Sequence, residues 1–242
     1  MTASPPSPHT PTPAENPGLF ISFEGPEGAG KTTQIDLLTR RLRAAGREVR
    51  TTREPGGTPL GEQLRAVLLD PSVSDRDPVI EALLMMASRR DHLQQVIRPQ
   101  LAAGAVVLTD RYADSTYAYQ GYGSGVDHQW IATVMAAVTD GLLPALTVLL
   151  DLDPAVGLAR KYRLLGDEEA VSSFERRALD YHQRVRHGFQ ELARASPERW
   201  LVLNATRPVE WVGNRIWERV EPLVKAMATP NHAESVGSRP ET

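Results

Sequence analysis

A glycine-rich octapeptide near the N-terminus has the residue types and spacing of a phosphate-binding loop. It reads Gly-Pro-Glu-Gly-Ala-Gly-Lys-Thr over residues 25–32 and fits the pattern G-x-x-x-x-G-K-[ST]. Glycines let the backbone curl so that successive N–H groups point inward, and the helix expected after the loop adds its positive N-terminal end. Lys31 can then reach the β- and γ-phosphates, while the Thr32 hydroxyl is placed to bind Mg²⁺. The expected ATP-binding residues are Gly25, Pro26, Glu27, Gly28, Ala29, Gly30, Lys31, Thr32 and Thr33.

Two further basic residues stand directly after strand-like runs. Arg53 follows one such run, and Asp110 and Arg111 follow another. If the strands are parallel, their carboxyl ends meet at one edge of a sheet, where open α/β sheets bind their ligands. Asp110 could then join Thr32 in holding Mg²⁺, while the two arginines could make bidentate contacts with a terminal phosphate. Together with Lys31 they suggest more phosphate than ATP alone carries, so a nucleoside monophosphate is the expected second substrate.

Five short apolar or β-branched runs alternate with longer segments that have helical spacing. Strands separated by helices favour right-handed crossovers and a parallel sheet with helices on both faces. We therefore predict an α/β fold with a five-stranded parallel sheet, its strands lying at residues 19–23, 49–52, 105–109, 146–152 and 200–203. Helices are expected at residues 32–45, 60–69, 77–102 with a break inside, 127–139 and 208–227.

The clearest helical stripe lies in the last third of the chain. Its apolar residues stand three or four positions apart, at Phe174, Ala178, Tyr181, Val185, Phe189 and Leu192. Such a stripe could pack inside the domain or against a second subunit, and the spacing does not decide between the two.

The composition is that of a globular protein with one substantial core, since 41% of its 242 residues are hydrophobic. Residues 18–228 should form a single domain, between disordered tails at residues 1–17 and 229–242 that are polar and contain prolines. A net charge of −3 gives no basic field for nucleic acid or a membrane surface. There is no cysteine, no apolar run of membrane-spanning length and no signal-like or transit-like N-terminus. We expect a cytoplasmic protein with neither a membrane nor a nucleic-acid partner.

Several groups of residues, in order along the chain, resemble the motifs of thymidylate kinases. They are Phe-Glu-Gly at 23–25 with the phosphate loop after it, Arg-Glu-Pro-Gly-Gly-Thr at 53–58, Asp-Arg-Tyr at 110–112, and Ala-Tyr-Gln-Gly at 118–121. The resemblance runs from about residue 19 to about residue 217. It implies a P-loop nucleoside monophosphate kinase fold with a small lid, a homodimer, and phosphorylation of dTMP to dTDP with ATP and Mg²⁺ for dTTP synthesis.

The resemblance also implies roles for individual residues. Arg53 and Arg111 would hold the acceptor phosphate, and Glu27 would approach the deoxyribose 3′-hydroxyl. Arg89 and Thr116 would read the edge of the thymine. The implied substrate-binding residues are Glu27, Arg53, Met85, Arg89, Arg111, Ser115, Thr116, Tyr119 and Gln120.

The base and sugar pockets show one further expected role and two departures from the family pattern. Tyr119 would crowd the place where a ribonucleotide carries its 2′-hydroxyl, which favours deoxynucleotides. Met85 stands where the family usually has an aromatic residue four positions before Arg89, and it would give a softer contact with the base. Ser173 stands where related chains have an arginine two positions before Glu175.

The implied chemistry needs no general base, because most of a nucleoside monophosphate is already dianionic at neutral pH. Catalysis then consists of positioning the substrates and neutralising charge on the transferring phosphoryl group. No arginine stands among the variable loop positions 26–29, so the resemblance implies that a lid at about residues 160–173 supplies one. Arg160 and Arg163 are the candidates, with Arg176 as an alternative. The expected catalytic residues are Lys31, Arg111, Arg160 and Arg163.

Other functions stay open on this evidence. The same loop serves other nucleoside monophosphate kinases and deoxynucleoside kinases, and for a hydroxyl acceptor Glu24 or Asp110 could act as the base. A nucleotide-dependent switch or assembly protein is the alternative from another class, although the Asp-x-x-Gly and Asn-Lys-x-Asp motifs of GTPases are absent. A nucleic-acid-binding role is disfavoured, because the arginines cluster at a pocket edge rather than along an aromatic-lined stripe.

Overall fold

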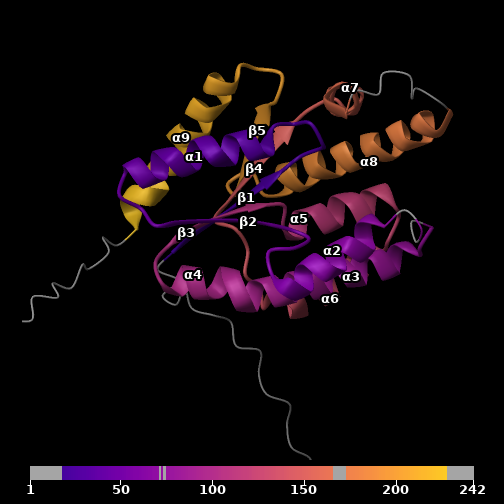
Figure 1. Cartoon of the computed structure of the whole chain (residues 1–242), viewed down its shortest axis with the longest axis horizontal. Coiled ribbons are helices and arrows are strands. Elements are labelled where there is room, and N and C mark those ends of the chain that lie inside the picture. The colour runs from indigo at the N-terminus through magenta and orange to yellow at the C-terminus, as the bar shows by residue number, and fades with distance from the viewer. Residues whose placement is uncertain (1–17, 71, 73–74, 166–172, 228–242) are drawn as a thin grey trace, which may run out of the picture.

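The computed structural model describes residues 18–70, 72, 75–165 and 173–227, without the side chains of residues 161–178. The expected tails at residues 1–17 and 229–242 lie outside this description, as do residues 166–172 of the expected lid. Within the described residues, one five-stranded sheet carries helices on both of its faces (Figure 1).

All five predicted strands are present. They are β1 Leu19–Glu24, β2 Val49–Arg53, β3 Val106–Asp110, β4 Leu146–Asp151 and β5 Trp200–Asn204. They hydrogen-bond in the order β2-β3-β1-β4-β5, and every neighbouring pair is parallel. The predicted α/β fold with a five-stranded parallel sheet is therefore confirmed.

Helices connect the strands, and most of them lie where helical spacing predicts them. The predicted break within 77–102 is a π-helical segment, η3, followed by Pro99, which has no N–H for a regular helical hydrogen bond. The sequence patterns did not predict α5, η4 or α7. No helix among the described residues is long and apolar enough to cross a membrane. The helical segments are α1 Lys31–Ala44, α2 Pro59–Leu69, α3 Pro78–His92, η3 Leu93–Ile97, α4 Arg98–Ala102, α5 Ala113–Thr116, η4 Tyr117–Gly123, α6 His128–Thr139, α7 Pro154–Leu165, α8 Ser173–Ala195 and α9 Val209–Ala226.

The central strand β1 separates two apolar cores, because successive strand residues point to opposite faces of a sheet. Leu19, Ile21 and Phe23 pack with residues of α1 and α9, whereas Phe20 packs with residues of α3, η3, α4 and α6. A third core lies between η4, α8 and the strands β4 and β5. Figure 1 shows α1 and α9 on one side of the sheet and α3 to α6 with α8 on the other. The central strands are buried on both faces as a result.

The long helix α8 packs along η4, and this contact decides the role of the predicted apolar stripe. Val185 and Phe189 are each only 1% exposed, in the core shared with η4. A side-chain carbon on Gly123 would come within 2.7 Å of the Tyr181 ring, so the two segments approach closely. This part of the stripe therefore packs inside the protein rather than against a second subunit.

The register of β1, β2 and β3 aligns their carboxyl ends. Asp110, the last residue of β3, lies opposite Phe23 of β1 and Arg53 of β2. The pairing continues past the strands, where the Glu54 N–H donates to the Asp110 carbonyl and the Arg111 N–H donates to the Phe23 carbonyl, both at 2.9 Å. The residues that the sequence singles out therefore emerge at one edge of the sheet.

A buried ion pair fastens the segment after β3 to the start of β5. Arg199 donates to the two Asp114 carboxylate oxygens at 2.7 and 2.9 Å, and to Thr147 Oγ1 at 2.8 Å. The Asp114 side chain is 6% exposed and that of Arg199 is 17% exposed. Thr147 is also hydrogen-bonded to Ser22 of β1 at 3.0 Å. This network holds α5, which contains Asp114, across β1, β4 and the start of β5.

Replacing Arg199 should destabilise the fold much more than replacing a surface cation. We expect Arg199→Ala to lower the free energy of unfolding by about 3 kcal/mol, because it leaves the Asp114 carboxylate buried without its partner. Lys225→Ala, which removes an exposed ion pair with Glu221, should cost less than about 1 kcal/mol. Urea unfolding followed by circular dichroism measures both changes, and equally small losses would contradict the expectation.

Candidate active site

The glycine-rich loop between β1 and α1 forms an anion cradle. Gly30 precedes α1 with φ 88°, no side chain caps the helix, and its first turn contains no acidic residue. The first N–H groups of α1 are thus left for an external anion. Lys31 is buried, and its Nζ donates to the carbonyls of Gly25 and Pro26, both at 3.2 Å. Burial, and then the charge of Arg111, lowers the pKa of Lys31 to about 8.

The outer side of the loop packs against the start of α7. A side-chain carbon on Gly28, which has φ 72°, would meet the carbonyl oxygen of Gly157 at 2.6 Å, so only glycine fits there. Arg160 of α7 donates from Nη1 to the carbonyls of Gly28 at 3.3 Å and Ala205 at 3.4 Å. Arg160 therefore contacts the phosphate loop, while the side chain of Arg163 lies outside the described part of the chain.

A loop after β5 completes this side of the site, although the sequence alone did not indicate it. Asn204 begins a turn by accepting a hydrogen bond from the Thr206 N–H at 2.8 Å, and the Arg207 guanidinium lies 4.8 Å from the Trp211 ring centre. The loop could have been found from its place at the carboxyl end of a parallel strand. A cavity of about 200 Å³ lies between it and the phosphate loop, lined by Ala29, Gly30, Thr33, Gln34, Arg160, Ala205, Arg207, Val209 and Val212.

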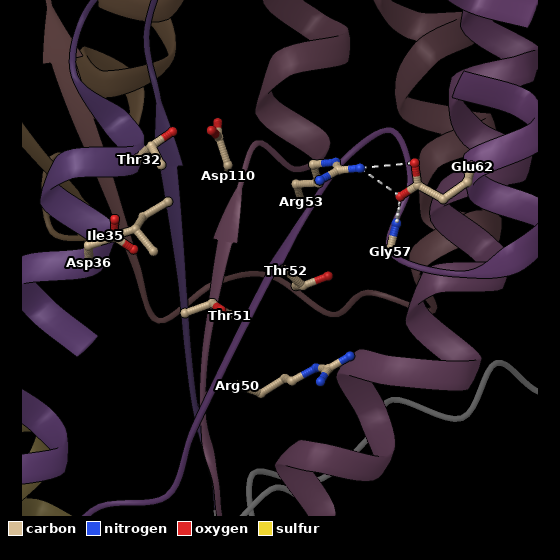
Figure 2. Close-up of a pocket in the computed structure, with 10 residues that line it drawn as sticks. All are labelled: Thr32, Ile35, Asp36, Arg50, Thr51, Thr52, Arg53, Gly57, Glu62 and Asp110. Atoms are coloured by element: carbon tan, nitrogen blue, oxygen red, sulfur yellow. Dashed lines mark hydrogen bonds and ion pairs between the residues drawn. The ribbon is translucent and has the colours of Figure 1, made fainter. Parts of the chain in front are cut away.

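A groove of about 360 Å³ opens on the opposite side of the phosphate loop. Figure 2 shows Asp110 between Thr32 and Arg53 at one end of this groove, with Arg50 further along β2. Asp110 Oδ1 lies 3.9 Å from Lys31 Nζ and is buried, yet it makes no hydrogen bond to any described residue. Thr32 is exposed. A buried carboxylate oxygen without a donor, beside an exposed hydroxyl, suits a hard cation.

Arg53 is held in place by a carboxylate from α2. Its Nη2 donates to both oxygens of Glu62 at 3.0 Å, and the Gly57 N–H donates to the same carboxylate at 2.9 Å (Figure 2). The Gly57 hydrogen bond, followed by that of Arg53, lowers the pKa of Glu62. The Arg53 guanidinium is nevertheless about half exposed, with 54% of the side chain accessible, so it can still contact a ligand in the groove.

The carboxylate of Glu24, at the end of β1, is fully buried behind the loop. It accepts hydrogen bonds from the Tyr112 N–H at 2.8 Å and from the Ser115 hydroxyl at 2.6 Å. Burial, and then the nearby Asp114 carboxylate, raises the pKa of Glu24 to about 8, against the opposing charge of Arg111. With both oxygens engaged, Glu24 is poorly placed to act as the base considered for a hydroxyl acceptor.

Arg111 turns back toward η4 through an unusual backbone conformation. Its φ is 74°, in the left-handed region that non-glycine residues seldom adopt outside functional sites. The guanidinium lies 4.8 Å from the Tyr119 ring centre and donates to Ser115 Oγ at 3.3 Å. Burial, and then Glu27, raises the pKa of Tyr119, whereas Arg111 opposes the shift. The charges of Arg111 and Glu27 thus both act on the Tyr119 hydroxyl.

Arg89 is fully buried and surrounded by acceptors. Its Nε donates to Glu54 Oε2 at 2.7 Å, its Nη1 to Thr116 Oγ1 at 2.8 Å, and its Nη2 to the Tyr112 carbonyl at 3.0 Å. The buried charge is matched by that of Glu54, whose side chain is 1% exposed. The structure thus brings the two predicted base-reading residues, Arg89 and Thr116, into contact with each other but exposes neither.

Gln120 supplies an acceptor at the same end of the site. Its Nε2 donates to Glu81 Oε1 at 2.7 Å, which leaves Oε1 buried and without a hydrogen-bond partner among the described residues. Met85 is partly exposed. An unpaired buried acceptor is costly, and a ligand donor would relieve that cost.

Comparison with known proteins shows the family of this chain. The thymidylate kinase family profile matches residues 23–216. The chain is 54% identical to a thymidylate kinase of Deinococcus radiodurans over 203 residues, which cover 84% of this chain and 96% of that protein. It is 48% identical to one of Magnetococcus marinus over 204 residues, covering 84% and 96%.

The chain belongs to the thymidylate kinase family. A crystal structure of the thymidylate kinase from Ehrlichia chaffeensis, 32% identical, matches with a TM-score of 0.69 over 84% of this chain and 98% of that chain. The five-stranded parallel sheet and its helices are thus the fold of this family as well as the one that the strand pattern predicts.

The pH dependence of stability should report the buried Glu24 of this thymidylate kinase. Because its pKa is raised in the folded protein, the folded state binds more protons than the unfolded state between pH 4.5 and 8. Stability should therefore fall as the pH rises through this window. Glu24→Gln can still accept from the Tyr112 N–H but cannot ionise, so its stability relative to wild type should grow by about 3 kcal/mol between pH 5 and pH 8.

Urea unfolding of the ligand-free proteins at several pH values makes this comparison. The exposed Glu48→Gln is the matched control and should follow the wild-type curve. If Glu24→Gln runs parallel to wild type as well, Glu24 is not the group that takes up the proton.

Proposed function

We propose that this thymidylate kinase transfers the γ-phosphoryl group of Mg²⁺-bound ATP to dTMP across the groove between the phosphate loop and the turn after β2. The activity is that of its family, phosphorylation of dTMP to dTDP. The observation that carries the residue-level proposal is that the register of three parallel strands places Asp110 and Arg53 at one groove, with Lys31 Nζ 3.9 Å from Asp110 Oδ1. Residues 18–228 would act as the single catalytic domain.

ATP would bind to the phosphate loop from the side of α7 and the loop after β5. The free N–H groups of the loop and the start of α1 would hold the phosphates, and the cavity beside Ala205 and Arg207 has room for the adenine. Arg160 already contacts the loop and would neutralise charge on the phosphates. This assignment gives the chain the bacterial-type arrangement, in which the P-loop itself lacks arginine and the lid supplies it.

Magnesium would be held by Thr32 and Asp110 together with the phosphates. The unpaired Oδ1 of Asp110 fits a cation, and no cluster of three or more acidic, histidine or cysteine ligands exists among the described residues to cage one by protein alone. Such sparse protein ligation is typical of Mg²⁺ at nucleotide sites. When bound, the ion would bridge phosphate oxygens and lower the repulsion between donor and acceptor.

The acceptor phosphate would lie between Arg53 and Arg111. Glu62 orients the Arg53 guanidinium, and the Arg111 guanidinium is steadied by Ser115 and by the Tyr119 ring. Two arginines give the planar, bidentate contacts that a dianionic phosphate favours. Because this dianion is already nucleophilic, the enzyme needs to hold it in line and to shield its charge rather than to remove a proton.

The sugar and base would extend from this phosphate toward α3 and η4. Glu27 would accept from the 3′-hydroxyl, and Tyr119 would occupy the place of a 2′-hydroxyl. Gln120 Oε1 would accept from thymine N3–H, a donor that cytosine lacks, which would exclude dCMP. Arg89 and Thr116 would read the thymine edge once the side chains that cover them shift, and Met85 would lie against the ring.

A substrate panel tests the assignment. The purified protein is incubated with ATP, Mg²⁺ and each of dTMP, dUMP, dCMP, dGMP, dAMP and thymidine, while ADP and the phosphorylated product are followed. We expect dTMP to be the preferred acceptor and EDTA to abolish turnover. Preferred phosphorylation of thymidine would contradict a phosphate site at Arg53, and preference for another monophosphate would contradict the base-reading roles.

Variants in the groove test where the acceptor phosphate binds. Arg53→Ala should raise the KM for dTMP by about 10- to 100-fold, the loss of a charge-assisted hydrogen bond, with little change in the KM for ATP. Arg50→Ala, in the same groove but further from the loop, should stay within about twofold of wild type. Arg160→Ala should instead raise the KM for ATP and leave the KM for dTMP unchanged. Equal effects of the Arg53 and Arg50 changes would place the phosphate elsewhere.

We also propose that the protein forms a homodimer through α2 and α3. These neighbouring helices expose large apolar side chains that are 47 to 64% accessible: Leu60, Val67, Leu69, Ile80 and Leu83. In α2 the sole buried residue is Gly61, so this helix leaves most of its apolar surface open. An apolar patch on neighbouring helices is typical of a protein–protein contact.

A charge on this patch should break the dimer. Leu83→Glu is expected to shift the protein to monomer in light scattering coupled to size-exclusion chromatography, because it would bury a carboxylate in an apolar interface. Leu143→Glu is the matched control, since Leu143 is similarly exposed, 52% against 47% for Leu83, but lies outside α2 and α3. A monomeric wild type, or a Leu83→Glu variant that dimerises like the control, would contradict the proposed interface.

A further inference from the structure

The turn after β2, residues 53–58, is tied to the site through one buried carboxylate. Glu54 Oε2 accepts from Arg89 Nε at 2.7 Å, and Oε1 accepts from His92 Nδ1 at 3.0 Å. Arg89 in turn donates to Thr116. Glu54 is therefore the junction between the turn that carries Arg53 and the residues at the base end of the site.

His92 is the second tie between the helix α3 and this turn. Its Nε2 is 2.6 Å from Thr52 Oγ1, the residue before Arg53, so one imidazole links Thr52 and Glu54 on either side of that arginine. The ring also lies against the other end of the turn, because a side-chain carbon on Gly57 would meet His92 Nε2 at 2.8 Å. The His92 side chain is completely buried and contacts no solvent.

Further hydrogen bonds from α3 reach the same turn. The Gly56 N–H donates to Ser88 Oγ at 3.3 Å, and the Thr58 hydroxyl donates to Asp91 Oδ2 at 2.5 Å. These contacts hold the turn as a rigid body against α3. Among the described residues of α3, however, only His92 hydrogen-bonds to both the residue before Arg53 and the carboxylate of Glu54.

We propose that His92 is a positioning residue for the acceptor nucleotide: through Thr52 and Glu54 it fixes the separation between the Arg53 turn and the Arg89–Thr116 pair. The site would thereby favour nucleotides whose distance from base to 5′-phosphate matches this separation. The inference rests on the proposed function, in which Arg53 binds the phosphate and the Arg89–Thr116 pair reads the base. His92 itself is buried beneath both and would touch no substrate.

The two nitrogens of His92 can be removed separately. In His92→Asn the amide takes the place of Nδ1, so the contact with Glu54 is kept and that with Thr52 is lost. In His92→Gln the amide takes the place of Nε2, so the contact with Thr52 is kept and that with Glu54 is lost. His187→Asn, at an exposed histidine of α8, is the matched control for the substitution itself.

The experiment measures the KM for dTMP, the KM for ATP, the inhibition constant of thymidine and the melting temperature for each protein. Thymidine lacks the phosphate, so its inhibition constant measures binding at the base end of the site without the phosphate contacts. For His92→Asn we expect the KM for dTMP to rise about fivefold, the loss of one hydrogen bond, with thymidine inhibition unchanged. For His92→Gln we expect thymidine inhibition to weaken by a similar factor. The KM for ATP should stay as in wild type in both variants.

Each other outcome overturns the inference. If both variants lower the melting temperature and raise the KM for ATP and the KM for dTMP by the same factor, His92 has only a structural role. If neither variant changes dTMP or thymidine binding while the wild type phosphorylates dTMP, the inference fails and the proposed function stands. If the wild type does not phosphorylate dTMP in this assay, the proposed function fails first and the inference falls with it.

Discussion

The parallel hydrogen-bond register of β1, β2 and β3 is the constraint on which the site depends. It places Asp110 level with Phe23 and Arg53, so that the phosphate loop, the acidic residue and the arginine turn leave the sheet at the same height. A shift of one residue in any strand would send its side chains to the opposite face. The two cores that bury the central strands oppose such a shift. The packing of these cores therefore also fixes the positions of Asp110 and Arg53 at the edge of the sheet.

Charge at this edge is concentrated and poorly solvated. Burial disfavours the charged form of each group. It raises the pKa of Glu24 to about 8 and lowers the pKa of Lys31 to about 8. Arriving phosphates would add negative charge beside Lys31 and Arg111 and would favour the protonated form of Lys31, since an opposite charge nearby favours the ionised form of a base. The site is thus arranged to bind anions. The phosphates of the substrates would reduce the repulsion between Lys31 and Arg111.

The helix α3 links the acceptor site to the proposed subunit contact. Its buried side chains Ser88, Arg89 and His92, with the partly buried Asp91, hold the turn after β2. Its first turns expose Ile80 and Leu83. The same rigid element would therefore face a partner subunit at one end and position a substrate at the other. The burial of Arg89 is possible because Glu54 and Thr116, from two different connections, converge on its guanidinium.

The sequence by itself determined the phosphate loop, the five parallel strands and the convergence of Arg53, Asp110 and Lys31, because these follow from local spacing and the rule that parallel strands end at one edge. It also predicted a break within residues 77–102, which the structure places at Leu93–Ile97. It did not predict α5, η4 or α7, and Tyr119 and Gly123 of η4 pack against α8, which is distant in the chain. Pairings such as Glu54 with Arg89, or Glu24 with Ser115, join residues far apart in the chain. Only the tertiary structure decided these pairings. Burial and the resulting pKa shifts depend on residues that are distant in the sequence, and local sequence patterns do not identify them.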